Sequence, residues 1–203
     1  MRRTLHAATL FLAFGLLGSA YAARISKNPR PRVALLSNGT EEIKGPKEIV
    51  EAHRLLKDHT AINFVGNIEG VDIPRGVADV VITSGFVGNV VLKMLEGVSE
   101  TVVRLARYAH KERLAWRLGL IALSSAIDQL KSVTDWQQYG GAPLLGFTHP
   151  FIKAHGRSNA RAITNAIKVA HKALSGNLCG NIARTMAELE ERAARRAPPT
   201  ASP

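Results

Sequence analysis

Lys44, Asn89 and His155 each follow a short apolar segment of the chain and could take part in chemistry. An ammonium group can hold a phosphate as a point charge, and an amide offers both a donor and an acceptor. An imidazole can act as a hydrogen-bond donor, a base or an anion ligand. Neighbouring glycines would let the backbone approach a ligand closely, and they are Gly45, Gly85, Gly88 and Gly156. This combination suggests a site for an anion.

Each of these side chains also has an ordinary structural explanation. Lys44 can be a solvated loop lysine, because lysines in loops are common. Asn89 can cap a helix, and His155 can be satisfied by loop carbonyl groups. Lys93, one helical turn after Asn89, can simply be solvated. The residue types alone leave these alternatives open.

The elements that would position these side chains repeat one design, an apolar strand followed by a small-residue turn and a helix. Strands are expected at 33–36, 62–67, 77–82 and 151–154. Helices are expected at 48–58, from near Val90, as a pair within 98–133, at 160–173 with Ser158 as N-cap, and at about 177–192. This order predicts an α/β protein with a layered sheet. Ligands of such sheets bind beyond the carboxyl ends of the strands, where helix N–H groups favour anions.

Composition and absent motifs narrow the classes of function. Lysine and arginine total 27 against 16 acidic residues, a net charge of +11, which points to acidic partners. The lone Cys179 excludes an intrachain disulfide and is too little for a cysteine-based zinc site. The sequence contains no G-x-x-x-x-G-K-[ST], G-x-G-x-x-G, G-x-S-x-G or H-E-x-x-H motif. We therefore expect no metal, no cofactor and no covalent mechanism.

A basic stretch at 99–117 is a candidate interaction surface. Its residues are Arg104, Arg107, Lys111, Arg113 and Arg117, with Trp116 in an apolar tip. An acidic carrier protein or an anionic membrane surface would suit this charge, whereas aromatic residues do not interleave with it as nucleic-acid binding would require. A solvated helix face is the alternative.

The N-terminus has two interpretations. Arg2 and Arg3 precede an apolar run from Leu5 to Leu17, and Ala20-Tyr21-Ala22 follows, which is the pattern of a secretory signal peptide. The same residues can form an ordinary core helix.

Five segments together resemble the C-terminal part of the acyl-acyl-carrier-protein:phosphate acyltransferase family. They are PRVALLSNGTEEIKG (31–45), INFVGNIEG (62–70), ADVVITSGFVGNVVLKMLEG (78–97), YGGAPLLG (139–146) and IKAHGRSNARAITNAI (152–167). The resemblance spans about residues 10–187. It implies that residues 1–28 are a helix of the fold and not a leader, that 29–187 are the C-terminal part of the acyltransferase domain, and that 188–203 are a helix end and a loose tail.

The resemblance carries several expectations. It implies transfer of a fatty acyl group from acyl carrier protein to inorganic phosphate, giving acyl phosphate for phospholipid synthesis. It implies an isocitrate/isopropylmalate dehydrogenase-like fold whose N-terminal half this chain lacks, and a protruding helical hairpin at about 99–133. It also implies a cytoplasmic homodimer with peripheral membrane contact. A catalytically inactive remnant that dimerises or binds membrane is the alternative, and a protein exported after cleavage at Ala22 is a weaker one.

Site roles follow from the resemblance position by position. Lys44 and Asn89 match residues that are essential in the family, and His155 and Lys93 match further family positions. Phosphate is its own nucleophile, so a cation and an oxyanion donor suffice. The chain departs from the family at Pro46-Lys47, where Asn-Glu is usual, and at Ser84, where an acidic residue is common.

Overall fold

The computed structural model describes residues 2–25, 28–112, 140–184 and isolated positions at 116, 119, 121–123 and 187. The chain forms two compact units, and each is described by itself. Unit 1 contains residues 1–83, 143–152 and 170–203, and unit 2 contains 84–142 and 153–169.

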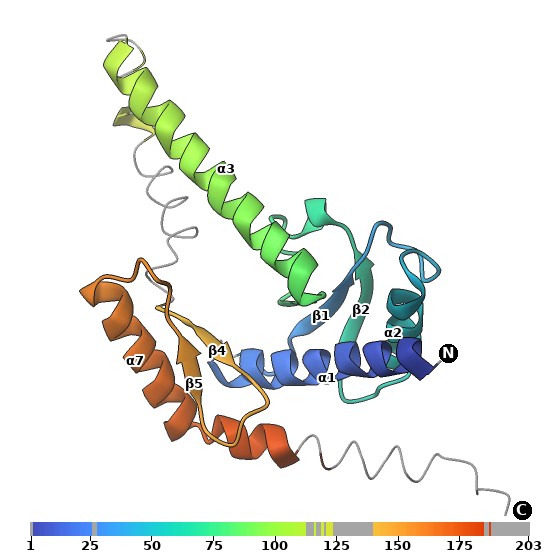
Figure 1. The fold of residues 1–203 in the computed structure, drawn as a ribbon. Coiled ribbons are helices and arrows are strands. Elements are labelled where there is room, and N and C mark those ends of the chain that lie inside the picture. The colour runs from blue at the N-terminus through green and yellow to red at the C-terminus, as the bar shows by residue number, and fades with distance from the viewer. Residues whose placement is uncertain are drawn as a thin grey trace, which may run out of the picture. The chain divides into compact units, whose positions relative to one another are not determined.

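Unit 1 contains a three-stranded parallel sheet with the order β2-β1-β3 (Figure 1). The strands are β1 (Arg32–Leu36), β2 (Asn63–Ile68) and β3 (Val80–Ile82). Four consecutive residues of β1 are buried, as the continuous apolar run predicts for a strand covered on both faces. Because β1 and β3 are parallel and Leu35 pairs with Ile82, their carboxyl ends lie at the same edge.

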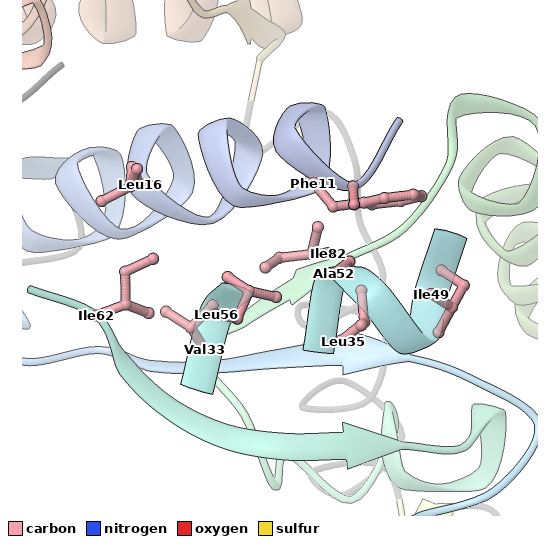
Figure 2. Close-up of a cluster of buried hydrophobic side chains, with 10 residues drawn as sticks. Phe11, Leu16, Val33, Leu35, Ile49, Ala52, Leu56, Ile62 and Ile82 are labelled. Carbon is pink, nitrogen blue, oxygen red and sulfur yellow. The ribbon is translucent and has the colours of Figure 1, made fainter. Parts of the chain in front are cut away.

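Two helices cover one face of this sheet and form the main core. They are α1 (Arg2–Ile25) and α2 (Lys47–Lys57). Figure 2 shows Phe11 and Leu16 of α1 above Val33 and Leu35 of β1, with the apolar side of α2 beside them. Apolar residues recur along α2 at helical spacing, at Ile49, Ala52 and Leu56, and together they form its buried side.

A β-bulge interrupts the pairing of β1 with β2. Val33 pairs with Phe64 but Ala34 pairs with Gly66, so Val65 is the extra residue. Gly66 has a φ of 99°, a conformation that glycine adopts without strain. Because side chains alternate along a strand, the extra residue changes which face the following side chains point to. This shift places Asn67 on the same side as Phe64.

A charged pair joins the starts of β1 and β3. Asp79 accepts hydrogen bonds from the Arg32 backbone at 2.7 Å and from its guanidinium at 3.0 and 3.1 Å. The Asp79 N–H donates to the Arg32 carbonyl at 2.9 Å. The guanidinium hydrogen bonds, with the backbone bond second, lower the pKa of Asp79 to about 2.

Unit 2 is built around the long helix α3 (Gly85–Glu112). Unit 1 also contains a 3₁₀ helix, η1 (Gly70–Asp72). Three further elements belong partly to unit 1 and partly to unit 2: β4 (Ala142–Leu144), β5 (Phe151–Lys153) and α7 (Ala160–Ser175). β4 and β5 form a sheet of their own. Residues 178–184 are also helical. The α/β class is confirmed, whereas the dehydrogenase-like fold stays a prediction.

The expected start of α3 near Val90 is wrong, and so is the expected N-cap of α7, although α7 begins at Ala160 as predicted; hydrogen bonds explain both differences. α3 begins at Gly85 because the Ser84 hydroxyl accepts the Val87 N–H at 3.3 Å and the Ser84 carbonyl accepts the Gly88 N–H at 2.8 Å. Asn89 therefore lies inside the helix and does not cap it. α7 is capped by Asn159, whose side-chain oxygen accepts the Ala162 N–H at 3.0 Å, and not by Ser158.

The N-terminal segment is a helix of unit 1. α1 continues through the apparent cleavage sequence, and Ala22 is buried. Ala8, Phe11 and Leu16 belong to the core, which fits the interpretation as a core helix. By length and composition alone, residues His6–Ala23 would also suffice to cross a membrane.

The expected hairpin at 99–133 is described only in part. α3 includes its first segment as one continuous helix to Glu112. Between 113 and 139 the structure describes only positions 116, 119 and 121–123, and the segment 188–203 lies outside the described residues.

Candidate functional site

Lys44 lies on the loop between β1 and α2, at the carboxyl edge of the parallel sheet. The Ser37 hydroxyl donates to the Lys44 carbonyl at 3.0 Å, and the Lys44 N–H donates to the Glu41 carbonyl at 3.1 Å. The side chain is exposed, and its ammonium has no hydrogen bond or ion pair with any other described residue. The backbone of Lys44 is held while its cation is available to an anion from solution.

Two glycines shape this loop. Gly45 has a φ of 104°, and a Cβ there would lie 2.9 Å from both Ile49 Cγ2 and Ser37 Oγ. A Cβ on Gly39 would lie 2.8 Å from Cγ of Lys44. Gly45 is therefore required by backbone and packing, and Gly39 leaves room for the lysine stem. That Gly45 lets a ligand approach the backbone closely stays a prediction.

A buried polar pair behind the loop was missed from sequence. His53 and Asn67 are each only 5% exposed, and the His53 Nδ1 lies 2.8 Å from the Asn67 Oδ1. The Asn67 Nδ2 donates to the Glu41 carbonyl at 2.9 Å. A signal was present: His53 stands among Ile49, Ala52 and Leu56 on the apolar side of α2, where a histidine needs a partner.

The acidic residue of the loop is paired. Glu42 forms a hydrogen-bonded ion pair with Lys57 and lies 3.8 Å from the His53 Nε2. The Lys57 hydrogen bond lowers the pKa of Glu42, so the carboxylate stays charged. The Glu42 carboxylate is therefore paired with Lys57 and not with Lys44.

In unit 2, Asn89, Lys93 and the basic residues expected to bind a partner lie on one face of α3. At about 100° per residue, positions 89, 93, 96, 100, 104, 107 and 111 fall on one side of the helix. We call these residues the α3 polar face: Asn89, Lys93, Glu96, Glu100, Arg104, Arg107 and Lys111. Asn89 and Lys93 are both exposed on it.

The segment after β5 meets this face. The Arg157 guanidinium lies 3.9 Å from Glu100, and the Lys93 ammonium donates to Glu96 at 2.7 Å. The Lys93 hydrogen bond lowers the pKa of Glu96, and the nearby charge of Arg157 acts in the same direction. The structure therefore brings Lys93, Glu96 and the 155–157 segment together within unit 2.

His155 has a defined hydrogen-bond role. Its Nδ1 accepts the Arg157 N–H at 3.1 Å. The neutral ring must then carry its proton on Nε2, which makes that atom a donor. Gly156 beside it and Gly85 at the start of α3 have open space where a Cβ would stand. Neither glycine is required by contacts with the described residues.

The predicted site residues divide between the two units. Lys44 and Gly45 belong to unit 1, and the others belong to unit 2. The segment with His155 follows β5, which pairs with β4 and is not part of the three-stranded sheet. Among the described residues, no three His, Cys, Asp or Glu side chains form a metal-ligand group.

Comparisons with known proteins identify the family. A model of the family described as "Fatty acid synthesis protein" matches residues 4–181. The chain belongs to this family. Curated relatives named "Phosphate acyltransferase" include one from Helicobacter pylori (strain Shi470), 43% identical over 177 residues that cover 87% of this chain and 52% of the relative.

Two further relatives of the fatty acid synthesis protein family carry the same name. The Syntrophotalea carbinolica protein is 47% identical over 162 residues, which cover 80% of this chain and 46% of the relative. The Lactiplantibacillus plantarum protein is 42% identical over 175 residues, which cover 86% of this chain and 50% of the relative. The chain spans about half the length of the curated relatives it matches.

The family match extends through α1, so the resemblance noted from residue 10 onward begins earlier, at residue 4. It also includes the basic stretch. Arg104, Arg107 and Lys111 lie on the α3 polar face, and the helical residue Trp116 is exposed. Arg113 and Arg117 lie outside the described residues.

Proposed function

We propose that the chain is an acyltransferase that moves a fatty acyl group from acyl carrier protein to inorganic phosphate. The product is an acyl phosphate, a precursor for phospholipid synthesis. The observation that carries the proposal is the exposed ammonium of Lys44, which has no partner among the described residues and lies on a fixed loop, in a chain 43% identical to a phosphate acyltransferase.

In the proposed mechanism, a phosphate oxygen attacks the thioester carbonyl carbon. Lys44 holds the phosphate through its charge and reduces the repulsion between two electron-rich reactants. The new C–O bond forms and a tetrahedral oxyanion results. The C–S bond then breaks, and the electron pair leaves with the carrier protein's sulfur. This sulfur takes up the proton that the attacking hydrogen phosphate gives up, so the carrier protein leaves as a thiol.

The residues of unit 2 have proposed roles in the same reaction. The Asn89 amide donates to the developing oxyanion, an interaction worth about 3 kcal/mol per donor in other enzymes. His155 donates from Nε2, the atom left with the proton when Nδ1 accepts from Arg157. Lys93 binds anionic substrate groups, although its partner Glu96 must then share it. Gly45, Gly85, Gly88 and Gly156 are proposed to allow the backbone to approach the substrates.

The proposal extends to partners and location. The basic residues of the α3 polar face, with Arg113, Arg117 and Trp116, are proposed to receive the carrier protein. We also propose a homodimer in the cytoplasm with peripheral membrane contact, and a dehydrogenase-like fold of which this chain supplies the C-terminal part. No nucleic acid, metal or cofactor is part of the proposal.

A second candidate function, membrane or self-association without turnover, has its own observation. Opposite the polar face, α3 exposes a continuous apolar side. Its residues are Val87, Val90, Met94, Leu95, Val98, Val102, Leu105 and Tyr108. An amphipathic helix with arginines on its polar side is typical of binding at an anionic lipid surface.

One assay separates the two functions. The purified chain is incubated with long-chain acyl carrier protein and phosphate, and acyl phosphate is measured alongside sedimentation with anionic vesicles. Turnover that disappears in Lys44→Ala and persists in the control Lys47→Ala supports the acyltransferase. Vesicle binding by a folded chain without turnover supports the second function and contradicts the first.

A further inference from the structure

The buried pair of His53 and Asn67 lies directly behind the Lys44 loop. Both residues are almost completely buried, at 5% exposure each, so neither is placed to contact a substrate. Ile49, Ala52 and Leu56 already hold α2 on the sheet through apolar contacts (Figure 2). A polar pair adds nothing to that hydrophobic contact and must satisfy its own hydrogen bonds. Its presence calls for a different explanation.

The direction of the hydrogen bonds is fixed by the Asn67 amide. Its Nδ2 donates to the Glu41 carbonyl, so its Oδ1 is the atom that faces His53. An oxygen can only accept, and the His53 Nδ1 must therefore carry a proton and donate. The His53 ring also packs edge-on against Phe64, with the two ring centroids 5.0 Å apart.

The Glu41 carbonyl connects this pair with Lys44. It accepts the Asn67 amide at 2.9 Å and the Lys44 N–H at 3.1 Å. A carbonyl oxygen has two lone pairs and can accept both bonds. The chain of contacts therefore runs from His53 through Asn67 and the Glu41 carbonyl to the backbone of Lys44.

The bulge in β2 makes this connection possible. His53 contacts Phe64 and Asn67 together, although residues three apart on a regular strand point to opposite faces. The extra residue at Val65 and the positive φ of Gly66 bring Asn67 to the α2 side. A bulge that redirects one side chain beside a functional loop is a recurrent device of sheets.

We infer that His53 and Asn67 are positioning residues that fix the backbone of Lys44 and so place its ammonium for phosphate. This inference rests on the proposed function of Lys44. Ser37 holds the other side of the same residue through the Lys44 carbonyl at 3.0 Å. Lys44 is thus held at both its N–H and its carbonyl, while its side chain remains exposed.

The first test measures hydrogen exchange of the Lys44 amide in the full chain, without any substrate. We expect protection of about 100-fold or more over an unstructured peptide, since opening requires the Asn67 link to break. An isolated turn in an exposed loop would exchange almost freely. An unprotected Lys44 amide in the wild-type chain overturns the inference, whatever the variants do.

The second test uses variants that remove one link each. Asn67→Asp keeps an acceptor for His53 and loses the donor to Glu41, and His53→Phe keeps a ring against Phe64 and loses the donor to Asn67. Each variant is expected to speed exchange of the Lys44 amide about tenfold, with the Leu56 amide changed less than about twofold. The control Arg54→Gln removes the exposed pair with Glu51 and should leave both amides unchanged.

Three results would overturn the inference: no change at Lys44 in folded Asn67→Asp, an equal change at Lys44 and Leu56, or the same change in Arg54→Gln. An equal change would mean that the pair only stabilises the unit. In the acyl-transfer assay, we expect Asn67→Asp to raise the phosphate KM about tenfold with a much smaller effect on kcat. Absence of turnover in every chain would contradict the proposed function and leave the exchange result standing.

Discussion

The hydroxyl of Ser37 donates to the carbonyl of Lys44 at 3.0 Å and closes the loop that leads from β1 to α2. The same hydroxyl oxygen lies where a Cβ on Gly45 would come within 2.9 Å. The closed loop therefore depends on the hydrogen bond to the Lys44 carbonyl and on the absence of a side chain at the next residue, Gly45. This arrangement places Lys44 at the carboxyl edge of the parallel sheet, where ligands of α/β proteins bind.

Replacing Gly45 tests that dependence. Gly45→Ala must adopt a φ of 104° and place a methyl against Ile49 and Ser37, so we expect a loss of stability of at least about 1 kcal/mol and a loss of any activity that needs Lys44. Denaturant unfolding of the purified chain measures the first effect. Gly85→Ala is the control, because its Cβ would meet open space at a helical position and should be neutral or stabilising. Equal effects of both substitutions would contradict this account of Gly45.

The Arg32–Asp79 pair predicts a pH dependence of stability. The pKa of Asp79 is lowered from 3.8 to about 2 by the Arg32 hydrogen bonds, so the folded state binds this proton less readily than the unfolded state. The stabilisation is therefore complete above about pH 4 and is lost as the pH falls toward 2. Asp79→Asn should lower the unfolding free energy at pH 7 and have little effect near pH 2. Urea unfolding at both pH values measures this difference.

A matched variant is available for the same measurement. Asp58→Asn changes an exposed carboxylate that lies 3.7 Å from Arg54, and exposed pairs of this kind contribute little. Its effect at pH 7 should be smaller than that of Asp79→Asn. A loss of stability in Asp79→Asn that is as large at pH 2 as at pH 7 would show that the charge of Asp79 is not its cause.

The placement of α1 can be tested by two leucines on the same helix. Leu16 is only 4% exposed in the core, whereas Leu10 is 57% exposed. Leu16→Ala should lower the unfolding free energy by about 2–5 kcal/mol, and Leu10→Ala by no more than about 0.5 kcal/mol. Calorimetry or denaturant unfolding gives both values. Similar small effects of the two substitutions would argue that α1 is not part of the folded core.

The identity of the α7 N-cap can be tested by substituting the neighbouring residues Asn159 and Ser158. Asn159→Ala removes the bond to the Ala162 N–H and should cost about 1 kcal/mol. The Ser158 hydroxyl is buried without a hydrogen-bond partner among the described residues, so Ser158→Ala should be neutral or stabilising. Thermal unfolding distinguishes the two. A larger loss for Ser158→Ala would restore Ser158 as the cap.

β1, β2 and α2 could be predicted from sequence because their signals are local, whereas no strand was expected at β4. Val33 to Leu36 form a continuous apolar run, and Ile49, Ala52 and Leu56 repeat at helical spacing. The burial of β1 and the boundaries of α2 agree with these patterns within two residues. The parallel pairing of β1 with β2 and β3 follows the expected α/β class.

The features that were missed depend on contacts between distant segments. His53 and Asn67 are 14 residues apart and meet only because a bulge redirects the end of β2. The spacing of residues 62–67 does not reveal that bulge, since Gly66 can also be read as an ordinary strand glycine. The cap residues were misassigned for a related reason. Ser84 and Asn89 are both plausible caps of α3, Ser158 and Asn159 are both plausible caps of α7, and only the hydrogen bonds distinguish them.

The most direct test of the central claim is the rate of acyl phosphate formation from long-chain acyl carrier protein and phosphate. The purified chain is compared with Lys44→Ala, and Lys47→Ala serves as a nearby exposed control. We predict turnover by the wild-type and Lys47→Ala chains and a loss of at least about 100-fold in Lys44→Ala. Turnover that is unchanged in Lys44→Ala, or no turnover in a folded wild-type chain, would contradict the claim.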